Sequence, residues 1–269
     1  MSKLFLSIRT LIERIESVRA ERLDGRLQGI TKKLFLTFYP TYRFTGAISG
    51  FSNGVGGAGG GMRRGTKVDV EMRKACEDVR NGRAPTVHHP YAQKALKALQ
   101  ALQLKLVDAQ VPVFCAATGF KTYIDIVCID EKGVAVVVEL KCGFRGYHDR
   151  SSGRMLHEFK TLTNAPKNQH MLQLAITSRM FALTYPGIAF RGLLLRSEER
   201  GVEWTNMDEN VYKHSMRALN RMQYTPDATD SRPNSKVIKK TRTYVTPKKK
   251  KCSNRRTMPV RRRRIVRKK

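Results

Sequence analysis

The chain has 269 residues, enough for one sizeable folded core with appendages, and its 52 basic and 22 acidic residues give a formal net charge of +30. So large an excess of positive charge favours an anionic partner, and nucleic acid is the expected one. The five scattered cysteines, with no C-x-x-C pair, give neither a disulfide framework nor a zinc or iron–sulfur site. Because no apolar run reaches the roughly 20 residues of a membrane span and no signal peptide is recognisable, we expect an intracellular protein without a membrane partner.

The first predicted element is an amphipathic helix over residues 3–23. Its apolar side chains recur at alternating steps of four and three, with Arg and Glu between them, at Leu4, Ile8, Leu11, Ile15 and Val18. We expect this stripe to pack on the chain's own domain. Two alternatives are a homodimer through residues 4–18 and a mitochondrial presequence, which the glutamates of the helix oppose. The helix belongs to a predicted N-terminal helical region, residues 1–48.

Residues 49–61 are rich in glycine and are predicted to form a flexible linker. They do not match the phosphate-binding G-x-x-x-x-G-K-[ST] loop, because no Lys-Ser or Lys-Thr follows at the required place. Arg63 and Arg64 lead into a helix expected at about 65–81, and a second helix is expected at about 90–103.

The remaining pattern alternates strands and helices. Three strands, a helix, two strands and a helix follow in that order, at about 106–115, 122–130, 133–141, 167–182, 189–196, 201–206 and 208–221. The first three strands are joined by short turns and should form an antiparallel meander. The predicted fold class is α/β, one mixed sheet flanked by helices, in a domain that spans residues 62–225. Trp204, on the last strand, is expected in the core.

The composition of residues 226–269 changes to Lys, Arg, Pro, Ser and Thr, and this tail is predicted to be disordered. From residue 231 onward it contains eighteen Lys or Arg and no acidic residue. Two basic clusters resemble nuclear localisation signals or nucleic-acid contacts, and they include Lys248, Lys249, Arg261 and Arg262. We therefore expect a nuclear protein whose tail is an import signal or a DNA-binding arm.

Asp125, Glu139 and Lys141 are the most informative residues, because they stand on the second and third strands of the meander. Residues two apart on a strand point to one face, so Glu139 and Lys141 share a face. Asp125 and Glu139 on adjacent strands can meet at one Mg²⁺ or Mn²⁺, with the carbonyl of Leu140 in reach, and Lys141 can orient an attacking water. The alternative is an exposed cross-strand ion pair between Glu139 and Lys141.

This arrangement resembles the motif of the PD-(D/E)xK nuclease superfamily, with Ile124 in place of the family's proline. Residues 64–69 are similar to the helix-opening motif of its RecB-like exonuclease branch, with Asp69 where the branch has a metal-binding histidine. Glu71 is a rival for that role, although residues two apart on a helix do not share a face.

A second similarity to the branch lies in residues 167–177, which resemble its Q-x-x-x-Y segment. Gln173 fits the glutamine, and Thr177 stands where the tyrosine is expected. Gln169, four residues before Gln173, lies on the same helix face, and both could bind the DNA backbone.

The resemblance implies a magnesium-dependent deoxyribonuclease that leaves a 5′-phosphate and is an exonuclease or a structure-specific nuclease. Asp69, Asp125 and Glu139 would hold the metal, Lys141 would position the water, and Gln173 would support the DNA. Further DNA contacts are expected at basic residues before and after the motif, namely Arg63, Arg64, Arg145 and Arg150.

A non-catalytic basic protein that binds or packages nucleic acid is the alternative function. The acidic cluster distinguishes the two, because a pure binder has no need of carboxylates that would repel phosphate. A compact nuclease with a basic tail of its own would suit a DNA virus or an organellar maintenance system.

Overall fold

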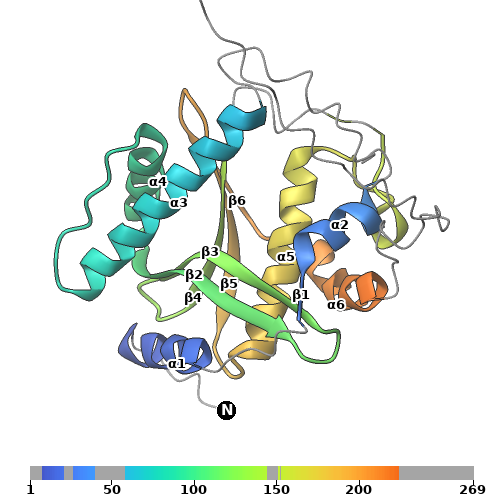
Figure 1. The fold of residues 1–269 in the computed structure, drawn as a ribbon, viewed down its shortest axis with the longest axis horizontal. Helices are drawn as coiled ribbons and strands as arrows, with labels where there is room; N and C mark the ends of the chain where they lie inside the picture. The colour runs from blue at the N-terminus through green and yellow to red at the C-terminus, as the bar shows by residue number, and fades with distance from the viewer. Residues whose placement is uncertain (1–7, 21–26, 40–57, 144–150, 152, 224–269) are drawn as a thin grey trace, which may run out of the picture. The chain divides into compact units, whose positions relative to one another are not determined.

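A six-stranded mixed sheet forms the centre of the fold, with helices on both of its faces (Figure 1). The computed structural model describes residues 8–20, 27–39, 58–143, 151 and 153–223, with the side chains of 58–63 left aside. All of these belong to one unit, Met1–Ser231, and the second unit, Arg232–Lys269, lies outside the described residues. The predicted disordered tail, 226–269, therefore also lies outside them.

The strands confirm the predicted meander. In chain order they are β1 (Gln28–Gly29), β2 (Lys105–Cys115), β3 (Phe120–Ile129), β4 (Ala135–Cys142), β5 (Phe190–Ser197) and β6 (Val202–Asn206). β2, β3 and β4 pair antiparallel, β5 pairs parallel with β4, and β6 pairs antiparallel with β5. The short strand β1, which was not predicted, pairs parallel with the start of β3. Trp204 on β6 is 50% exposed, so its predicted place in the core is wrong.

The helices cover the two faces of the sheet. They are α1 (Ile8–Ala20), α2 (Ile30–Phe38), α3 (Ala58–Arg80), α4 (Pro90–Ala101), α5 (Pro166–Thr184) and α6 (Glu209–Gln223), with a 3₁₀ turn at His157–Phe159. α3 and α4 pack on one face, and α1, α2, α5 and α6 on the other (Figure 1). α5 is the crossover between the parallel strands β4 and β5. None of the described helices is both long and apolar enough to span a bilayer.

Two helices differ from the prediction, one in where it begins and one because it was not expected. α3 begins at Ala58, so residues 58–61 of the predicted linker 49–61 are helical, and the rest of that segment lies outside the described residues. α2 was not predicted, although Ile30, Leu34 and Phe38 recur every four residues and are buried. α4 and α5 each begin with proline at the first helical turn, where its missing N–H costs no hydrogen bond.

Burial of both faces explains the apolar character of the central strands. Along β4, Ala135 and Val137 belong to the core under α5, whereas Val136, Val138 and Leu140 belong to the core under α3 and α4. A strand that is covered on both sides has a continuous apolar sequence, as residues 134–138 do before Glu139.

The N-terminal helix α1 packs on the chain's own sheet, as expected. Leu11 and Ile15 are fully buried in the same core as β2 and α5. Arg19 at the end of α1 contacts the buried Asp108 of β2, with 2.7 Å between Arg19 Nη1 and Asp108 Oδ2. The apolar stripe that a homodimer through residues 4–18 would use is thus covered at two of its positions. The predicted region 1–48 therefore contributes core residues to the domain that was expected to begin at residue 62.

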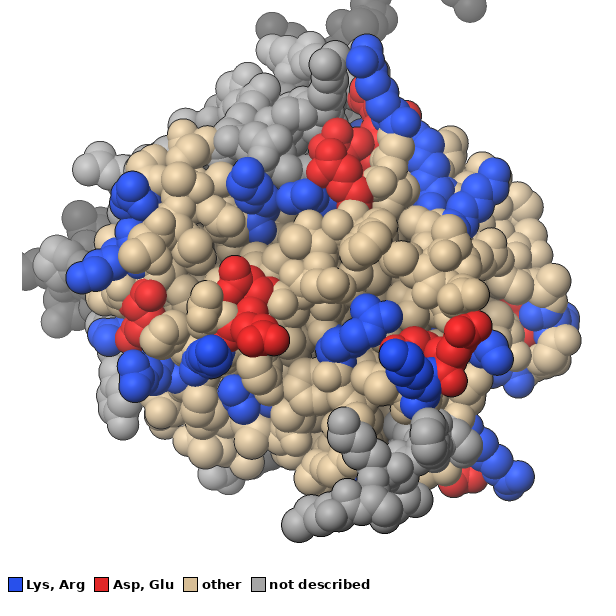
Figure 2. Space-filling view, turned by 180° about the vertical axis from the view of Figure 1, so that it is seen from behind, with Lys and Arg blue, Asp and Glu red and all other residues tan. Residues whose placement is uncertain are grey.

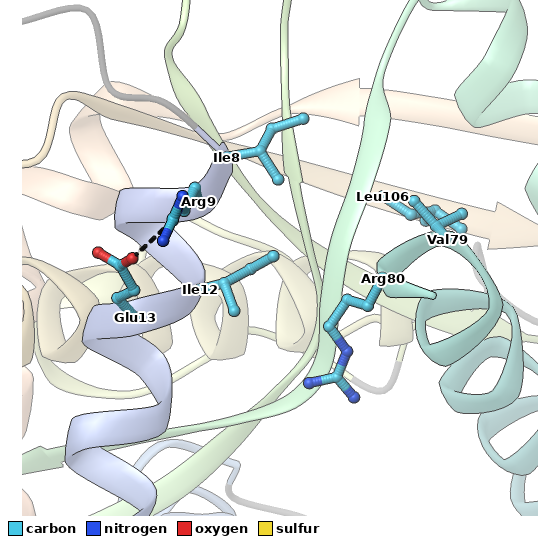
Figure 3. Close-up of a pocket in the computed structure, with 7 residues that line it drawn as sticks. All are labelled: Ile8, Arg9, Ile12, Glu13, Val79, Arg80 and Leu106. Atoms are coloured by element: carbon cyan, nitrogen blue, oxygen red, sulfur yellow. Dashed lines mark hydrogen bonds and ion pairs between the residues drawn. The ribbon is translucent and has the colours of Figure 1, made fainter. Parts of the chain in front are cut away.

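A shallow groove of about 510 Å³ lies where α1 meets the end of α3. Figure 3 shows Ile8 and Ile12 of α1 on one side of it, with Val79, Arg80 and Leu106 across from them. Mixed apolar and charged walls of this kind are what remains where an amphipathic helix crosses a sheet edge.

Replacing Ile15 by Ala tests the contribution of α1 to stability. The substitution should lower the free energy of unfolding by about 2–5 kcal/mol, because it leaves a cavity in a fully buried site. Urea denaturation monitored by circular dichroism measures the change. The control is Glu13→Ala, whose exposed ion pair with Arg9 on the same helix should contribute less than about 1 kcal/mol. Equal stabilities for the two variants would show that α1 is not part of the core.

Candidate active site

The strands β3 and β4 diverge next to Asp125 and Glu139. Their antiparallel pairing runs from Ile129 and Ala135 to Ile126 and Val138, and it stops there. Beyond that point β3 continues beside β2, and β4 continues beside β5 as far as Cys142. The two carboxylates are therefore the first residues past the last paired position, at the opening between the strands.

The side chain of Asp125 takes over the hydrogen bonding that the diverging strands lose. The backbone N–H of Leu140 donates to Asp125 Oδ2 at 2.9 Å. Within a strand, the N–H and C=O of one residue point to the same neighbouring strand. The carbonyl of Leu140 therefore faces the same opening, where the sequence placed it as a candidate metal ligand.

A local twist of the β2–β3 pair explains how Asp125 leaves the buried layer. Gln110 of β2 has a φ of 52°, between the pairs Ala109 with Ile126 and Val111 with Ile124. Ile124 and Ile126 are two residues apart and would share a face in a regular strand, yet they belong to opposite cores. Asp125 lies between them, at the point where the strand rotates.

Lys141 joins the two carboxylates. Its ammonium forms an ion pair with Glu139, and Lys141 Nζ lies 3.9 Å from Asp125 Oδ2. The side chain of Glu139 is 1% exposed, whereas those of Asp125 and Lys141 are 19% and 25% exposed. The ion pair between Glu139 and Lys141 that was the alternative interpretation is therefore present, but it is not exposed, because Glu139 is buried.

Asp69 approaches this site from α3. Burial raises the pKa of Asp69 from 3.8 to about 6, and the negative charge of Asp125 raises it further, while Lys141 and Arg73 oppose the shift. Glu71, its rival in the sequence, has another role: its carboxylate accepts hydrogen bonds from the backbone N–H groups of His88 and His89, both at 2.7 Å. Asp69 is thus the acidic residue of α3 that faces the strand opening.

The site holds more negative than positive charge. Burial raises the pKa of Glu139 from 4.5 to about 7, with Asp125 and Asp69 adding to the shift and Lys141 opposing it. Burial lowers the pKa of Lys141, but Glu139 and Asp125 outweigh burial and keep the ammonium charged. Three carboxylates therefore lie near one lysine, and a further cation would stabilise the ionised form of each carboxylate.

Tyr39, at the end of α2, is a neighbour of Glu139 that the sequence reasoning missed. It is buried, and burial followed by the charge of Glu139 raises its pKa above the ordinary range of tyrosine. Its hydroxyl donates to the backbone carbonyl of Gln169 on α5 at 3.3 Å. The apolar spacing of residues 30–38 was the available signal for α2, and it was not used.

Gln169, Gln173 and Thr177 of α5 differ in their hydrogen bonds and in their burial. The side-chain amide of Gln169 donates to Asn164 Oδ1 at 2.8 Å, so it is engaged within the protein. Gln173 lies one turn later on the same face, half-buried, and its side chain makes no hydrogen bond with another described residue. Thr177, at the tyrosine position of the resemblance, is buried and donates to the carbonyl of Leu174.

Of the predicted nucleic-acid contacts in the basic segments, Arg64 is the one whose side chain is described. Its guanidinium lies over the ring of Tyr91, 4.9 Å from the centroid. It is also close to Cys142, whose pKa burial raises to about 12, with Asp69 adding to the shift and Arg64 opposing it. Arg64 therefore lies at the edge of the carboxylate site. The others have no described side chains: Arg63, Arg145, Arg150, Lys248, Lys249, Arg261 and Arg262.

The surface charge of the described residues is mixed. On the face shown in Figure 2, basic side chains lie in small groups, most of them beside an acidic one. The basic side chains of the described residues are therefore not gathered in one patch of that face.

The oxygen donors of the site are those that hard divalent cations take. Asp125, Glu139 and the Leu140 carbonyl face the strand opening, and Asp69 adds a carboxylate from α3. In the part of the chain that the structure describes, no three His, Cys, Asp or Glu side chains are close enough to form a complete metal-binding group. Lys141 lies between the carboxylates in this arrangement.

No protein-family model and no curated protein matches the sequence. One solved structure to which the chain is similar is the crystal structure of SSO0001. The two are 12% identical, the match covers 81% of this chain and 88% of that chain, and the TM-score is 0.29. A likeness this low carries no argument about fold or function, so the α/β assignment depends on the sheet and helices described above.

Replacing Asp69 by Asn should stabilise the protein at about pH 8 but not at acidic pH. A raised pKa means that ionised Asp69 destabilises the folded state, and this penalty appears as the pH rises from about 4 through about 6. Its removal should add on the order of 1 kcal/mol to the free energy of unfolding. Urea midpoints in EDTA at about pH 4.5 and pH 8 measure the change.

Asp78, on the same helix, provides a control of opposite sign. The hydrogen bond from Arg83 lowers the pKa of Asp78, with 2.8 Å between Arg83 Nη2 and Asp78 Oδ1. Asp78→Asn should therefore destabilise at about pH 8, and the loss should fade as the pH falls through the lowered pKa. A gain for Asp69→Asn of equal size at both pH values would contradict the electrostatic explanation.

Proposed function

We propose that the chain is a divalent-metal-dependent nuclease of the PD-(D/E)xK type that hydrolyses phosphodiester bonds in DNA. The observation that carries the proposal is the meeting of Asp125, Glu139 and Lys141 where β3 and β4 diverge, with Asp69 of α3 beside them. Hydrolysis of a phosphodiester needs charge neutralisation at the phosphate, an activated water and a stabilised leaving oxygen. Carboxylates and a charged lysine at the open end of a sheet suit these needs.

The raised pKa values of Asp69 and Glu139 support a metal site. Burial and the neighbouring carboxylates disfavour the charged forms of both groups, and a bound Mg²⁺ or Mn²⁺ would favour those forms and supply a water acidified toward neutral pH. Asp125, Glu139 and the Leu140 carbonyl would be the ligands from the sheet, and Asp69 the ligand from α3. A cation between the carboxylates would require the ammonium of Lys141 to turn toward the water or the phosphate.

The order of elements supports the assignment to the PD-(D/E)xK superfamily. The chain contains, in order, the helix α3 with Asp69, the meander β2 to β4 with Asp125 and the Glu-x-Lys motif, and the crossover helix α5, which leads to the parallel strand β5. The resemblance further implies a 5′-phosphate product and exonuclease or structure-specific cleavage. Gln173, whose side chain has no hydrogen-bond partner among the described residues, would support the DNA backbone.

The basic composition supports DNA as the substrate and a nuclear location through the basic clusters of the tail. The same composition favours the alternative, a non-catalytic protein that binds or packages nucleic acid. The two are separated by metal-dependent cleavage alone, because both bind DNA.

Glu139→Gln and Lys141→Ala should each lower magnesium-dependent cleavage by at least about 100-fold, because each removes a group in contact with the reacting atoms. The assay uses end-labelled single-stranded, double-stranded and flap DNA with Mg²⁺, Mn²⁺ or EDTA. The matched controls are Glu131→Gln and Lys132→Ala, the exposed acid and base of the β3–β4 turn, which should cleave like the wild type. Thermal unfolding of each variant checks that the fold is retained.

Two results would overturn parts of this proposal. Full activity of both site variants would remove the catalytic assignment. A wild-type protein that binds DNA but cleaves none of the substrates with either metal would instead favour the packaging function.

Deleting the basic tail, residues 232–269, should lower DNA affinity and flatten its dependence on salt. The segment contains eighteen Lys or Arg, and each phosphate that it neutralises contributes about 0.9 to the slope of log K against log salt for duplex DNA. Fluorescence anisotropy titrations at several salt concentrations measure the slope. An unchanged slope would show that the tail does not contact DNA.

A further inference from the structure

A second hollow, of about 450 Å³, lies beside the carboxylate site. Its walls come from α3, the end of α1 and the β2–β3 pair, and its charged and aromatic lining consists of Arg19, Arg73, Glu77, Arg80, Asp108 and Tyr123. Arg73 stands one turn after Asp69 on α3, and Tyr123 stands two residues before Asp125 on β3. The walls from α3 and β3 therefore belong to the two elements that carry Asp69 and Asp125.

Arg73 is the arginine of this hollow that is available to bind an anion. It is exposed and forms no ion pair with any other described residue, and its charge lowers the pKa of Asp69. Arg19 and Arg80 are instead engaged with the buried Asp108, at 2.7 and 3.7 Å from Asp108 Oδ2. Asp108 is thereby neutralised and does not repel an anion, whereas Arg73 can bind one.

Tyr123 is the exposed aromatic residue of the hollow. It is 53% exposed although it stands on β3, the strand that pairs with β1, β2 and β4. Tyr123 stands two residues before Asp125 on β3, about 7 Å along the strand, and its side chain lines the hollow together with Arg73. An exposed ring next to a free arginine offers a stacking surface and a phosphate contact together.

We propose that this hollow binds the nucleotide adjacent to the scissile phosphate, with its base stacked on Tyr123 and its phosphate bound by Arg73. The inference depends on the proposed nuclease function and specifies its substrate class. In a duplex, the face of each internal base is covered by its neighbours, so only a single-stranded segment can stack on a side chain. The substrate is therefore DNA that is single-stranded at the site of cleavage: a single strand, a flap or a frayed end.

Glu77 is the residue of the hollow whose substitution should strengthen the binding of single-stranded DNA. It lies one turn after Arg73, is exposed, and has no ion-pair partner among the described residues. Its charge repels phosphate at the rim of the hollow, so Glu77→Gln should tighten the binding of single-stranded DNA where the other substitutions weaken it.

The test measures the equilibrium binding of the full chain to a fluorescein-labelled oligothymidine and to a blunt duplex. EDTA prevents metal-dependent cleavage, and elevated salt weakens the contribution of the basic tail. Tyr123→Ala should weaken single-strand binding about 5- to 100-fold and duplex binding less than about 2-fold, and Tyr123→Phe should retain wild-type affinity. Arg73→Ala should weaken single-strand binding and lower the salt slope by about one.

The controls lie on other elements. Trp204→Ala removes an aromatic residue of similar exposure from β6, and Lys97→Ala removes an exposed base from α4. Both variants should bind like the wild type.

The outcomes separate this inference from the nuclease proposal. Unchanged single-strand binding in Tyr123→Ala and Arg73→Ala overturns the nucleotide site, even where the wild type cleaves DNA with Mg²⁺. Equal losses for single strand and duplex overturn the stacking role. If the two variants selectively lose single-strand binding and the wild-type chain does not cleave DNA, the hollow remains a single-strand binding site and the nuclease function is overturned.

Discussion

The hydrogen bond from the Leu140 N–H to the Asp125 carboxylate is the interaction on which the candidate site depends. Two paired strands cannot separate without leaving backbone groups unsatisfied, and an unpaired buried N–H costs about as much as a lost hydrogen bond. Asp125 supplies the acceptor from a side chain at the first position past the last strand pair. Glu139 and Lys141 lie on β4 next to the opening that results. A regular β3–β4 pair would have closed this space with backbone hydrogen bonds.

The charges of the site are held at a cost to stability. Glu139 is almost fully buried, and its pKa near 7 shows that the surroundings disfavour its charge even with Lys141 in contact. Asp69 faces the same penalty to a smaller degree. The sheet offsets this cost by burying both of its faces, with α3 and α4 on one side and α1, α2, α5 and α6 on the other. Strained electrostatics of this kind are typical of functional sites, because selection for stability alone would neutralise them.

The N-terminal helices connect the core to the proposed substrate surface. Arg19 of α1 forms an ion pair with the buried Asp108 of β2, and Tyr39 after α2 is near enough to Glu139 to feel its charge and donates a hydrogen bond to the backbone of α5. Arg19 also lines the hollow that Arg73 and Tyr123 share, so the end of α1 forms part of its wall. If that hollow binds a nucleotide, the metal-ligand candidates and the strand-binding residues come from the same two elements, α3 and β3, so a displacement of either would alter both functions.

The sequence by itself determined most of the secondary structure, the meander and the pairing of Asp125 with Glu139 and Lys141. Alternation on strands, helical spacing and turn residues are local signals, and a hairpin brings neighbouring strands together whatever surrounds them. Sequence reasoning misplaced the start of α3, left out α2 and β1, and put Trp204 in the core. It preferred Asp69 to Glu71 but could not say what Glu71 contacts. Only the tertiary structure decided these points, because they depend on contacts between distant segments: Glu71 is held by the backbone at residues 88 and 89, and Asp69 faces a strand more than fifty residues later. The nucleotide hollow is of the same kind, since Arg73 and Tyr123 become neighbours only when α3 packs beside β3.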